Sequence, residues 1–296
     1  MSKTLGQDPS AGREVAPAAA GTAAARPGSP EAARIVVTGK GGVGKTTLTA
    51  LLARLLARRG LRILAVDGDA QMNLGYALGV PLHEAEAIVP LNRNADYIEE
   101  KTGARPGAGW GLLLRLNPDA EDAVDRFAVR APDGVQLLTM GTLSQAAAGC
   151  LCPENELLGA AMSAIALREG ELILLDTQAG VEHFGRALAR GFGQALIVSD
   201  PTFNGVGVAL QTARLASQLG IPALHLVVNR IRSDADLMRA RAYLRRSPEV
   251  RFTSLHALPY DDVVLEAEPS VEALLDGSRS PFAAAVQRLA AVLLPA

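Results

Sequence analysis

A glycine-rich segment near the start of the chain has the composition and spacing of a phosphate-binding loop. Residues 39–46 read Gly-Lys-Gly-Gly-Val-Gly-Lys-Thr, which fits the pattern G-x-x-x-x-G-K-[ST]. Glycines let backbone N–H groups approach phosphate oxygens, Lys45 is placed to reach the outer phosphates, and Thr46 is placed to hold Mg²⁺. A glycine-rich turn without a ligand is the alternative. The residues predicted to bind ATP with Mg²⁺ are Gly39, Lys40, Gly41, Gly42, Val43, Gly44, Lys45, Thr46 and Thr47.

Lys40 stands out because lysine is rare in this chain. The sequence has 4 lysines against 25 arginines, and Lys40 and Lys45 both lie in the loop. A compact ammonium group, rather than a planar guanidinium, is therefore indicated there. The loop resembles the deviant Walker A loop of the MinD, ParA and nitrogenase iron protein group, in which the extra lysine reaches the partner's nucleotide. The resemblance implies an ATP-sandwich homodimer, whereas the alternative is an exposed loop lysine.

Carboxylates follow two other apolar runs. Asp176 comes after residues 172–175, Leu-Ile-Leu-Leu, and Asp67 and Asp69 come after residues 63–66. The carboxyl ends of parallel strands meet at the edge of the sheet that binds ligands. Asp176 is predicted to act on Mg²⁺ through a coordinated water. By the same resemblance Asp69 orients the attacking water, while a strand-end cap remains open for Asp67.

The catalytic residues predicted from these segments are Lys40, Lys45, Asp69 and Asp176. Towards the C-terminus, Asn229 follows the run 226–228, and Pro259 lies in Leu-Pro-Tyr-Asp at 258–261. Similar loops hold adenine in the group named above, so the resemblance implies adenine contacts at Asn229 and Pro259. An Asn after a strand is commonly a turn residue, and the order of the motifs supports this assignment more than the residue itself.

The only two cysteines, Cys150 and Cys152, are one residue apart. Such cysteines can be small core residues. Thiolates are also soft ligands for Zn²⁺, Cu⁺ or Ni²⁺, which take up to four donors, and one chain offers two. A two-fold axis near this segment would bring both pairs into one intersubunit S₄ site.

Several segments resemble the CooC family of nickel-insertion ATPases, which mature carbon monoxide dehydrogenase. The likeness rests on residues 149–155, Gly-Cys-Leu-Cys-Pro-Glu-Asn, and on 176–186. It extends through 100–103 and 116–118, and covers about residues 34–265. It implies a homodimer that binds ATP and one Ni²⁺ or Zn²⁺ at Cys150 and Cys152, couples hydrolysis to metal delivery, and serves a nickel enzyme such as carbon monoxide dehydrogenase.

The chain departs from the CooC pattern at three positions. Thr177 and Gln178 replace Met and Glu of Asp-Met-Glu-Ala-Gly, and Ala70 stands where proline is usual. Loss of the carboxylate beside switch II, the loop around Gly180, implies weaker coupling or a different client. His183 is as readily a local hydrogen-bonding group as a metal or switch residue.

Alternating apolar runs and helical-period segments predict a doubly wound α/β fold, with a mostly parallel sheet covered by helices on both faces. Residues 81–132 are predicted to form an insertion beside the sheet. The predicted strands are 34–38, 62–66, 135–139, 171–175, 194–198, 223–228 and 252–257. The predicted helices are 44–59, 155–168, 181–191, 206–219, 235–246 and 281–294.

Composition narrows the class of protein. The chain has 296 residues, 49% of them hydrophobic, and a net charge of -2, which disfavours a nucleic-acid partner. No segment reaches the roughly 20 apolar residues that span a bilayer, so no membrane partner is expected. The Ala, Gly and Pro-rich residues 1–31 are predicted to be a disordered tail, and 32–296 a single P-loop ATPase domain. Two adjacent cysteines form no disulfide framework, which predicts a cytoplasmic protein.

Two other functions remain open from the sequence. A positioning ATPase like MinD or ParA is expected to carry a basic amphipathic C-terminal helix or a basic face, yet residues 282–294 hold only Arg288. A redox role like that of the nitrogenase iron protein uses cysteines well separated in sequence, unlike this pair. One isolated cluster of arginines is interpreted as ordinary helix surface; it comprises Arg239, Arg241, Arg245, Arg246 and Arg251.

Overall fold

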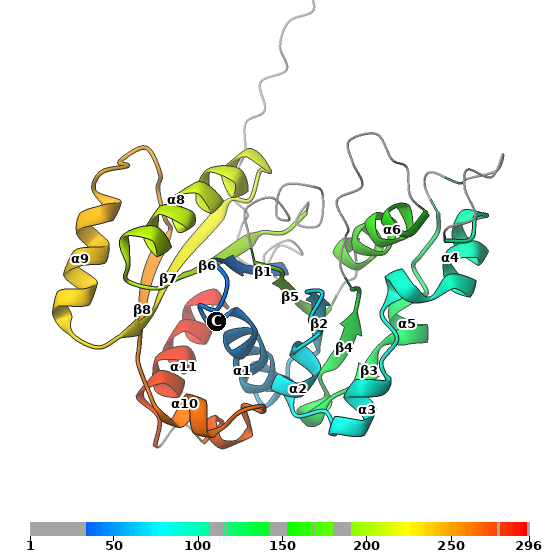
Figure 1. The fold of residues 1–296 in the computed structure, drawn as a ribbon, viewed down its shortest axis with the longest axis horizontal. Helices are drawn as coiled ribbons and strands as arrows, with labels where there is room; N and C mark the ends of the chain where they lie inside the picture. The colour runs from blue at the N-terminus through cyan, green and yellow to red at the C-terminus, as the bar shows by residue number, and fades with distance from the viewer. Residues whose placement is uncertain are drawn as a thin grey trace, which may run out of the picture.

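The strands lie side by side in one sheet that places β1 near its middle (Figure 1). The structure is a computed structural model, and it describes residues 34–106, 115, 118–141, 153–167, 170–179, 191–276 and 279–294. The eight strands run in the order β3-β4-β2-β5-β1-β6-β7-β8, and each neighbouring pair is parallel except β3 with β4. The strands are β1 (Arg34–Gly39), β2 (Ile63–Gly68), β3 (Val129–Arg130), β4 (Gln136–Thr139), β5 (Leu172–Thr177), β6 (Gln194–Ser199), β7 (Ala223–Ile231) and β8 (Ser254–Pro259).

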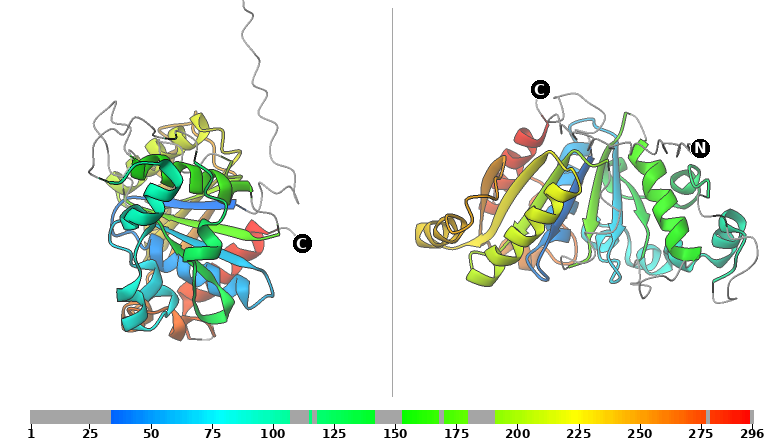
Figure 2. Two further views of the ribbon diagram at one scale, coloured as in Figure 1. Left: turned by 90° about the vertical axis from the view of Figure 1, so that its right-hand side faces the viewer. Right: turned by 90° about the horizontal axis from the view of Figure 1, so that it is seen from above.

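Helices cover both faces of this sheet, as Figure 2 shows. One apolar core joins the sheet to α1, α2 and α11, and the other joins it to α4, α5, α6, α8 and α9. The helices are α1 (Lys45–Ala57), α2 (Leu74–Leu78), α3 (Leu82–Ala87), α4 (Ala95–Thr102), α5 (Ala123–Phe127), α6 (Pro153–Leu167), α8 (Phe203–Gln218), α9 (Asp234–Leu244), α10 (Val263–Glu266) and α11 (Pro281–Leu293). The predicted doubly wound α/β fold is confirmed.

The central strands are buried from end to end, because helices cover them above and below. Every residue of β1, β5 and β6 is buried. Continuous apolar runs are what such doubly covered parallel strands require. The predicted helix 181–191 lies outside the described residues except for its last position.

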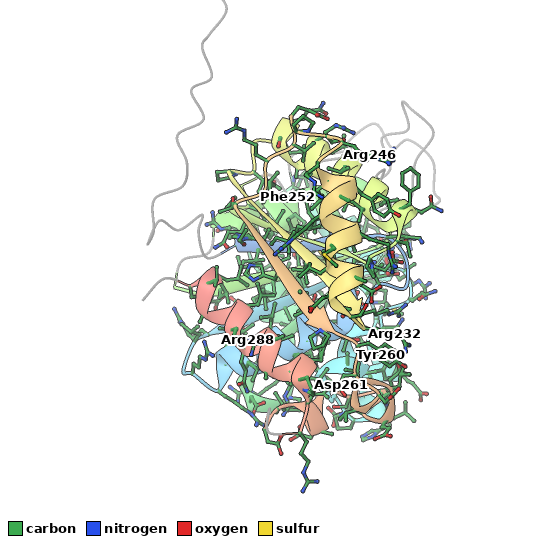
Figure 3. The ribbon with its side chains drawn as sticks, turned by 90° about the vertical axis from the view of Figure 1, so that its left-hand side faces the viewer. Arg232, Arg246, Phe252, Tyr260, Asp261 and Arg288 are labelled. Atoms are coloured by element: carbon green, nitrogen blue, oxygen red, sulfur yellow. The ribbon has the colours of Figure 1, made fainter. Side chains whose placement is uncertain are left out.

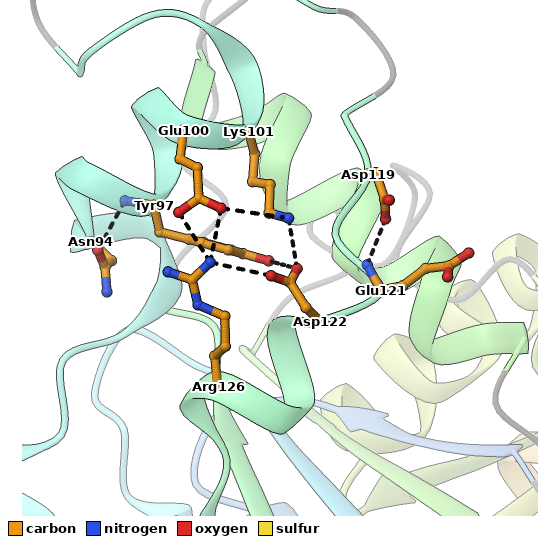
Figure 4. A network of polar contacts seen from close by, with 8 residues as sticks. All are labelled: Asn94, Tyr97, Glu100, Lys101, Asp119, Glu121, Asp122 and Arg126. Carbon is orange, nitrogen blue, oxygen red and sulfur yellow. Dashed lines mark hydrogen bonds and ion pairs between the residues drawn. The ribbon is translucent and has the colours of Figure 1, made fainter.

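The insertion at 81–132 contains the short helices α3, α4 and α5, which the sequence pattern did not resolve. A cluster of polar side chains, shown in Figure 4, joins α4 to α5. Lys101 lies 2.9 Å from a carboxylate oxygen of Asp122, and Arg126 bonds to Glu100 at 2.9 and 3.0 Å. The Tyr97 hydroxyl donates to Asp122 at 2.8 Å, and burial together with this bond raises the pKa of the tyrosine. These bonds fix the two ends of the connection from α4 to α5.

A buried arginine ties the first helix to the end of the chain. Arg54 on α1 is 2% exposed, donates to Asp133 at 2.7 Å and pairs with Glu272. Its Nη1 also donates to the Leu78 carbonyl at 3.3 Å. Burying a guanidinium is tolerated only when its charge and donors are matched in this way.

Within the described residues, no helix is long and apolar enough to cross a membrane.

Candidate functional site

The phosphate loop connects β1 to α1 and depends on glycine at two positions. Gly39 has a φ of 146°, and a Cβ there would lie 2.1 Å from the Val198 carbonyl oxygen. Gly44 has a φ of 93°, and a Cβ there would lie 2.8 Å from Asn229 Nδ2. Only glycine combines these dihedral angles with such close approach. The loop therefore packs against β6 on one side and the end of β7 on the other.

Lys45, the first residue of α1, is buried and donates to the Lys40 carbonyl oxygen at 3.2 Å. Burial lowers the pKa of its ammonium group, against the opposing charges of Asp176 and Asp69. A phosphate beside Lys45 would favour its charged form. Thr47, the third helical residue, is half-buried.

Thr46 and Asp176 meet across the end of the sheet. Thr46 Oγ1 donates to Asp176 Oδ2 at 2.6 Å, while Asp176 Oδ1 is buried and has no hydrogen-bond partner within the described residues. Burial raises the pKa of Asp176 to about 7, and the Thr46 bond opposes that rise. An orphaned carboxylate oxygen beside a threonine hydroxyl fits the coordination chemistry of Mg²⁺.

Asp67 and Asp69 have different environments. Asp67 is fully buried and accepts from the backbone N–H groups of Asp69 and Leu74, both at 3.0 Å. Burial raises its pKa to about 6, partly offset by those two bonds. Asp69 is half-buried and accepts from Gln71 N–H at 3.0 Å. Asp67 thus holds the loop that carries Asp69. The sequence alone leaves open only that Asp67 caps the end of its strand.

The backbone of Asp67 also reaches β4. Its carbonyl oxygen accepts from Met140 N–H at 2.9 Å. Met140 and Gly141 begin the connection that contains the two cysteines. The end of β2 is thus hydrogen-bonded to the residue that follows β4.

Lys40 follows Gly39 in the loop, and its side chain is 42% exposed. Its Nζ is 3.8 Å from Asp200 Oδ2, at the end of β6. The sequence prediction missed Asp200, although it follows a predicted strand at the same edge of the sheet as Asp67 and Asp176. That common position is the signal by which it could have been found.

Asn229 at the end of β7 contacts the phosphate loop, with its Nδ2 donating to the Val43 carbonyl at 2.9 Å. Pro259 ends β8, one residue before Tyr260. The Arg232 guanidinium lies 3.6 Å from the centre of the Tyr260 ring, and both lie together where α9 begins and β8 ends (Figure 3). Asn229 and Pro259 therefore lie on neighbouring strand ends, while the predicted adenine contacts stay predictions.

Thr177, the first departure from the CooC pattern, is buried and donates to the Val37 carbonyl at 2.9 Å. Cys150, Cys152, Gly180 and His183 lie outside the described residues. Across the ranges that the structure describes, no group of three or more His, Cys, Asp and Glu side chains is arranged to hold a metal ion.

The central loop, the Thr46–Asp176 contact and the parallel sheet define a P-loop nucleoside triphosphatase fold. Residues 35–272 match the family described as the CobQ/CobB/MinD/ParA nucleotide binding domain. The chain belongs to this family.

Several relatives match most of the chain, two of them at 35% identity or more. An uncharacterized ATP-binding protein of Methanocaldococcus jannaschii is 36% identical over 236 residues, covering 79% of this chain and 88% of the relative. The carbon monoxide dehydrogenase accessory protein CooC of Rhodospirillum rubrum is 35% identical over 235 residues, covering 79% of this chain and 86% of the relative. The two are thus about equally similar to this chain.

Solved structures share the fold at lower identity. The MinD cell division protein of Aquifex aeolicus has a TM-score of 0.59 and 22% identity, covering 89% of this chain and 97% of its own. The septum site-determining protein MinD of Pyrococcus horikoshii, complexed with Mg-ADP, has a TM-score of 0.57 and 21% identity, covering 88% and 95%.

Proposed function

We propose that this chain is an ATP-dependent metallochaperone that delivers nickel to an enzyme of the carbon monoxide dehydrogenase type. The observation that carries the proposal is the 35% identity to the accessory protein CooC over 86% of that protein's length. The pair Cys150 and Cys152 supports it, because the chain has no other cysteine and two adjacent thiolates suit a soft metal.

The nucleotide part of the proposal uses the residues that converge at the loop. Lys45 and the loop N–H groups bind the phosphates of ATP, and Thr46 and Asp176 hold Mg²⁺. Bound Mg²⁺ supplies positive charge that offsets charge on the phosphate oxygens. Asp69, carried on the loop that Asp67 holds, orients the attacking water. Lys40, whose side chain is partly exposed, serves the nucleotide of the partner subunit.

The metal part places the cargo at a two-fold axis. Each subunit contributes Cys150 and Cys152, and a tetrahedral site of four thiolates then requires a homodimer. ATP closes the dimer and shapes the thiolate site, and hydrolysis opens it for release. Zn²⁺ fits the same donors, so selectivity for nickel depends on availability and the client enzyme.

A titration of Ni²⁺ without air, with and without ATP, tests this function. The expected endpoint is one metal per two chains, with loss of tight binding in Cys150→Ser and in Cys152→Ser. Lys45→Ala is the matched control, because it is expected to lose ATP binding and to keep metal binding. An endpoint of one metal per chain, or unchanged affinity in either serine variant, would refute the intersubunit site.

A positioning ATPase is the second candidate. It is favoured by relatives such as the septum site-determining protein MinD of Bacillus subtilis, 29% identical over 205 residues. Sedimentation with anionic lipid vesicles in the presence of ATP distinguishes the two, because a metallochaperone is expected to remain in the supernatant.

A redox role is tested separately: an iron–sulfur protein would show charge-transfer absorption when purified without air.

A further inference from the structure

Arg230, at the end of β7, has a backbone conformation that is rare for its residue type. Its φ is 61°, in the left-handed region that side chains disfavour. The ladder between β7 and β8 is irregular between Val228 and Ile231, so the strand bulges here. Asn229 Oδ1 stabilises the bend by accepting from Arg230 N–H at 2.8 Å. Strained residues of this kind concentrate at functional sites.

The bend turns two consecutive side chains onto two consecutive carbonyls of the phosphate loop. Asn229 Nδ2 donates to Val43 O at 2.9 Å, and Arg230 Nη2 donates to Gly42 O at 2.7 Å. The arginine contact is charge-assisted and short, which makes it the stronger type of hydrogen bond. A residue in ordinary extended conformation at position 230 would direct its side chain differently, so the strained backbone and the contact belong together.

These carbonyls belong to the peptide groups that present N–H donors on the other side of the loop. The Gly42 carbonyl shares its peptide with Val43 N–H, and the Val43 carbonyl shares its peptide with Gly44 N–H. In a phosphate loop the N–H groups point inward to the phosphates. A donor that bonds the carbonyl fixes the plane of the peptide and polarises its N–H group.

We propose that Arg230 is a positioning residue of the nucleotide site: it holds the Gly42 peptide from behind and polarises the Val43 N–H group towards the phosphates. The inference rests on the proposed ATP binding. Because the loop N–H groups serve phosphates that ATP and ADP share, Arg230 strengthens binding of both nucleotides. It touches no reacting atom, so it acts on nucleotide affinity and leaves the hydrolysis step of the bound complex nearly unchanged.

Three variants separate the side chain from the strained backbone. Arg230→Ala removes the guanidinium and keeps a residue that disfavours this φ, whereas Arg230→Gly removes the guanidinium and relieves the strain. Arg230→Lys keeps a charge that can donate to the same carbonyl. Titration of the full chain with Mg-ATP and with Mg-ADP, thermal unfolding, and steady-state hydrolysis are measured for each.

The expected result is an equal loss of affinity in the Ala and Gly variants, about fivefold to tenfold for both nucleotides. KM rises by a similar factor while kcat stays within about twofold of the parent. Arg230→Gly melts higher than Arg230→Ala, and Arg230→Lys recovers part of the lost affinity. A purely structural role predicts instead that the more stable Gly variant binds better than the Ala variant.

Two outcomes would overturn the inference. Wild-type affinity in Arg230→Gly, with ATP binding to the wild type intact, would refute the role of Arg230 and leave the proposed function standing. Absence of ATP binding in the wild type itself would refute both.

Discussion

Asp67 and Asp176 lie opposite each other on the neighbouring parallel strands β2 and β5, and both are buried. Their carboxyl groups nevertheless have different partners. Asp67 accepts two backbone N–H bonds, whereas Asp176 accepts from the Thr46 hydroxyl and keeps one oxygen without a hydrogen-bond partner within the described residues. One carboxyl therefore supports a loop, and the other is suited to a cation.

Asp69→Asn is expected to slow ATP hydrolysis by roughly 100-fold while ATP still binds, because an amide orients water poorly and accepts no proton. The Asn side chain can still accept the bond from Gln71 N–H, so stability should not change. Phosphate release and size-exclusion chromatography with ATP check both points, with a trapped dimer as the expected species. Hydrolysis at the parental rate, or a monomer with ATP bound, would remove Asp69 from this role.

Lys40→Ala is expected to keep nucleotide affinity within about twofold and to abolish ATP-induced dimerisation and turnover. Its contact to Asp200 is long and partly exposed, so the free energy of unfolding should change by less than about 0.5 kcal/mol. Lys45→Ala is the control and should lose nucleotide binding. Dimerisation and hydrolysis at normal levels in Lys40→Ala would contradict the assignment.

Arg54→Ala is expected to destabilise the protein by about 2 to 4 kcal/mol, because it removes a fully buried side chain together with its bonds to Asp133 and Glu272. Arg58, which is 41% exposed and contacts the same two carboxylates, offers a matched control. Arg58→Ala should cost less than about 1 kcal/mol. Equal costs for the two variants in urea unfolding would show that burial does not decide the effect.

His225→Leu is expected to reduce the loss of stability at acid pH. His225 is 4% exposed, its Nδ1 lies 2.7 Å from Ser254 Oγ, and that oxygen lies 2.6 Å from His256 Nε2. Burial, with the His256 charge, lowers the His225 pKa to about 4. The neutral ring is favoured in the folded state, so its contribution is complete above about pH 6.5 and is lost as the pH falls towards 4.

The size of that effect is limited to about 3 kcal/mol by the change in pKa. Asp67 and Asp176 titrate in the same pH range, but their effect on stability has the opposite sign. Their raised pKa values favour the protonated folded state as the pH falls. The measurement is therefore the difference in unfolding free energy between wild type and His225→Leu from pH 7 to pH 4. A difference that does not change with pH would contradict the prediction.

The core strands could be predicted because their sequences satisfy one strong requirement, burial on both faces. Residues 34–38 and 194–198 were predicted, and β1 and β6 extend each by one residue. The edge strand β3 was missed because two residues carry no periodic pattern. The strand predicted at 252–257 begins two residues later as β8, whose edge position leaves all its residues except Leu258 half-buried and its pattern weak.

The candidate site likewise contains residues that local sequence patterns predict and contacts that those patterns do not predict. The glycines, Lys45, Thr46 and Asp176 follow local patterns, and the structure brings them together. The contacts of Asp200 and Arg230 could not be predicted, because each depends on a partner more than 150 residues away in the sequence. The φ of Arg230 in particular follows from a bulge in the ladder, which residue type does not indicate.

The bond between the Asp67 carbonyl and Met140 N–H has a thermodynamic consequence. A nucleotide that shifted the Asp69 loop would, through this bond, also shift the start of the segment that carries Cys150 and Cys152. Coupling of this kind is reciprocal. If ATP raises the affinity for nickel by some factor, nickel must raise the affinity for ATP by the same factor, so the loaded protein would reach half-saturation at a lower ATP concentration than the empty one.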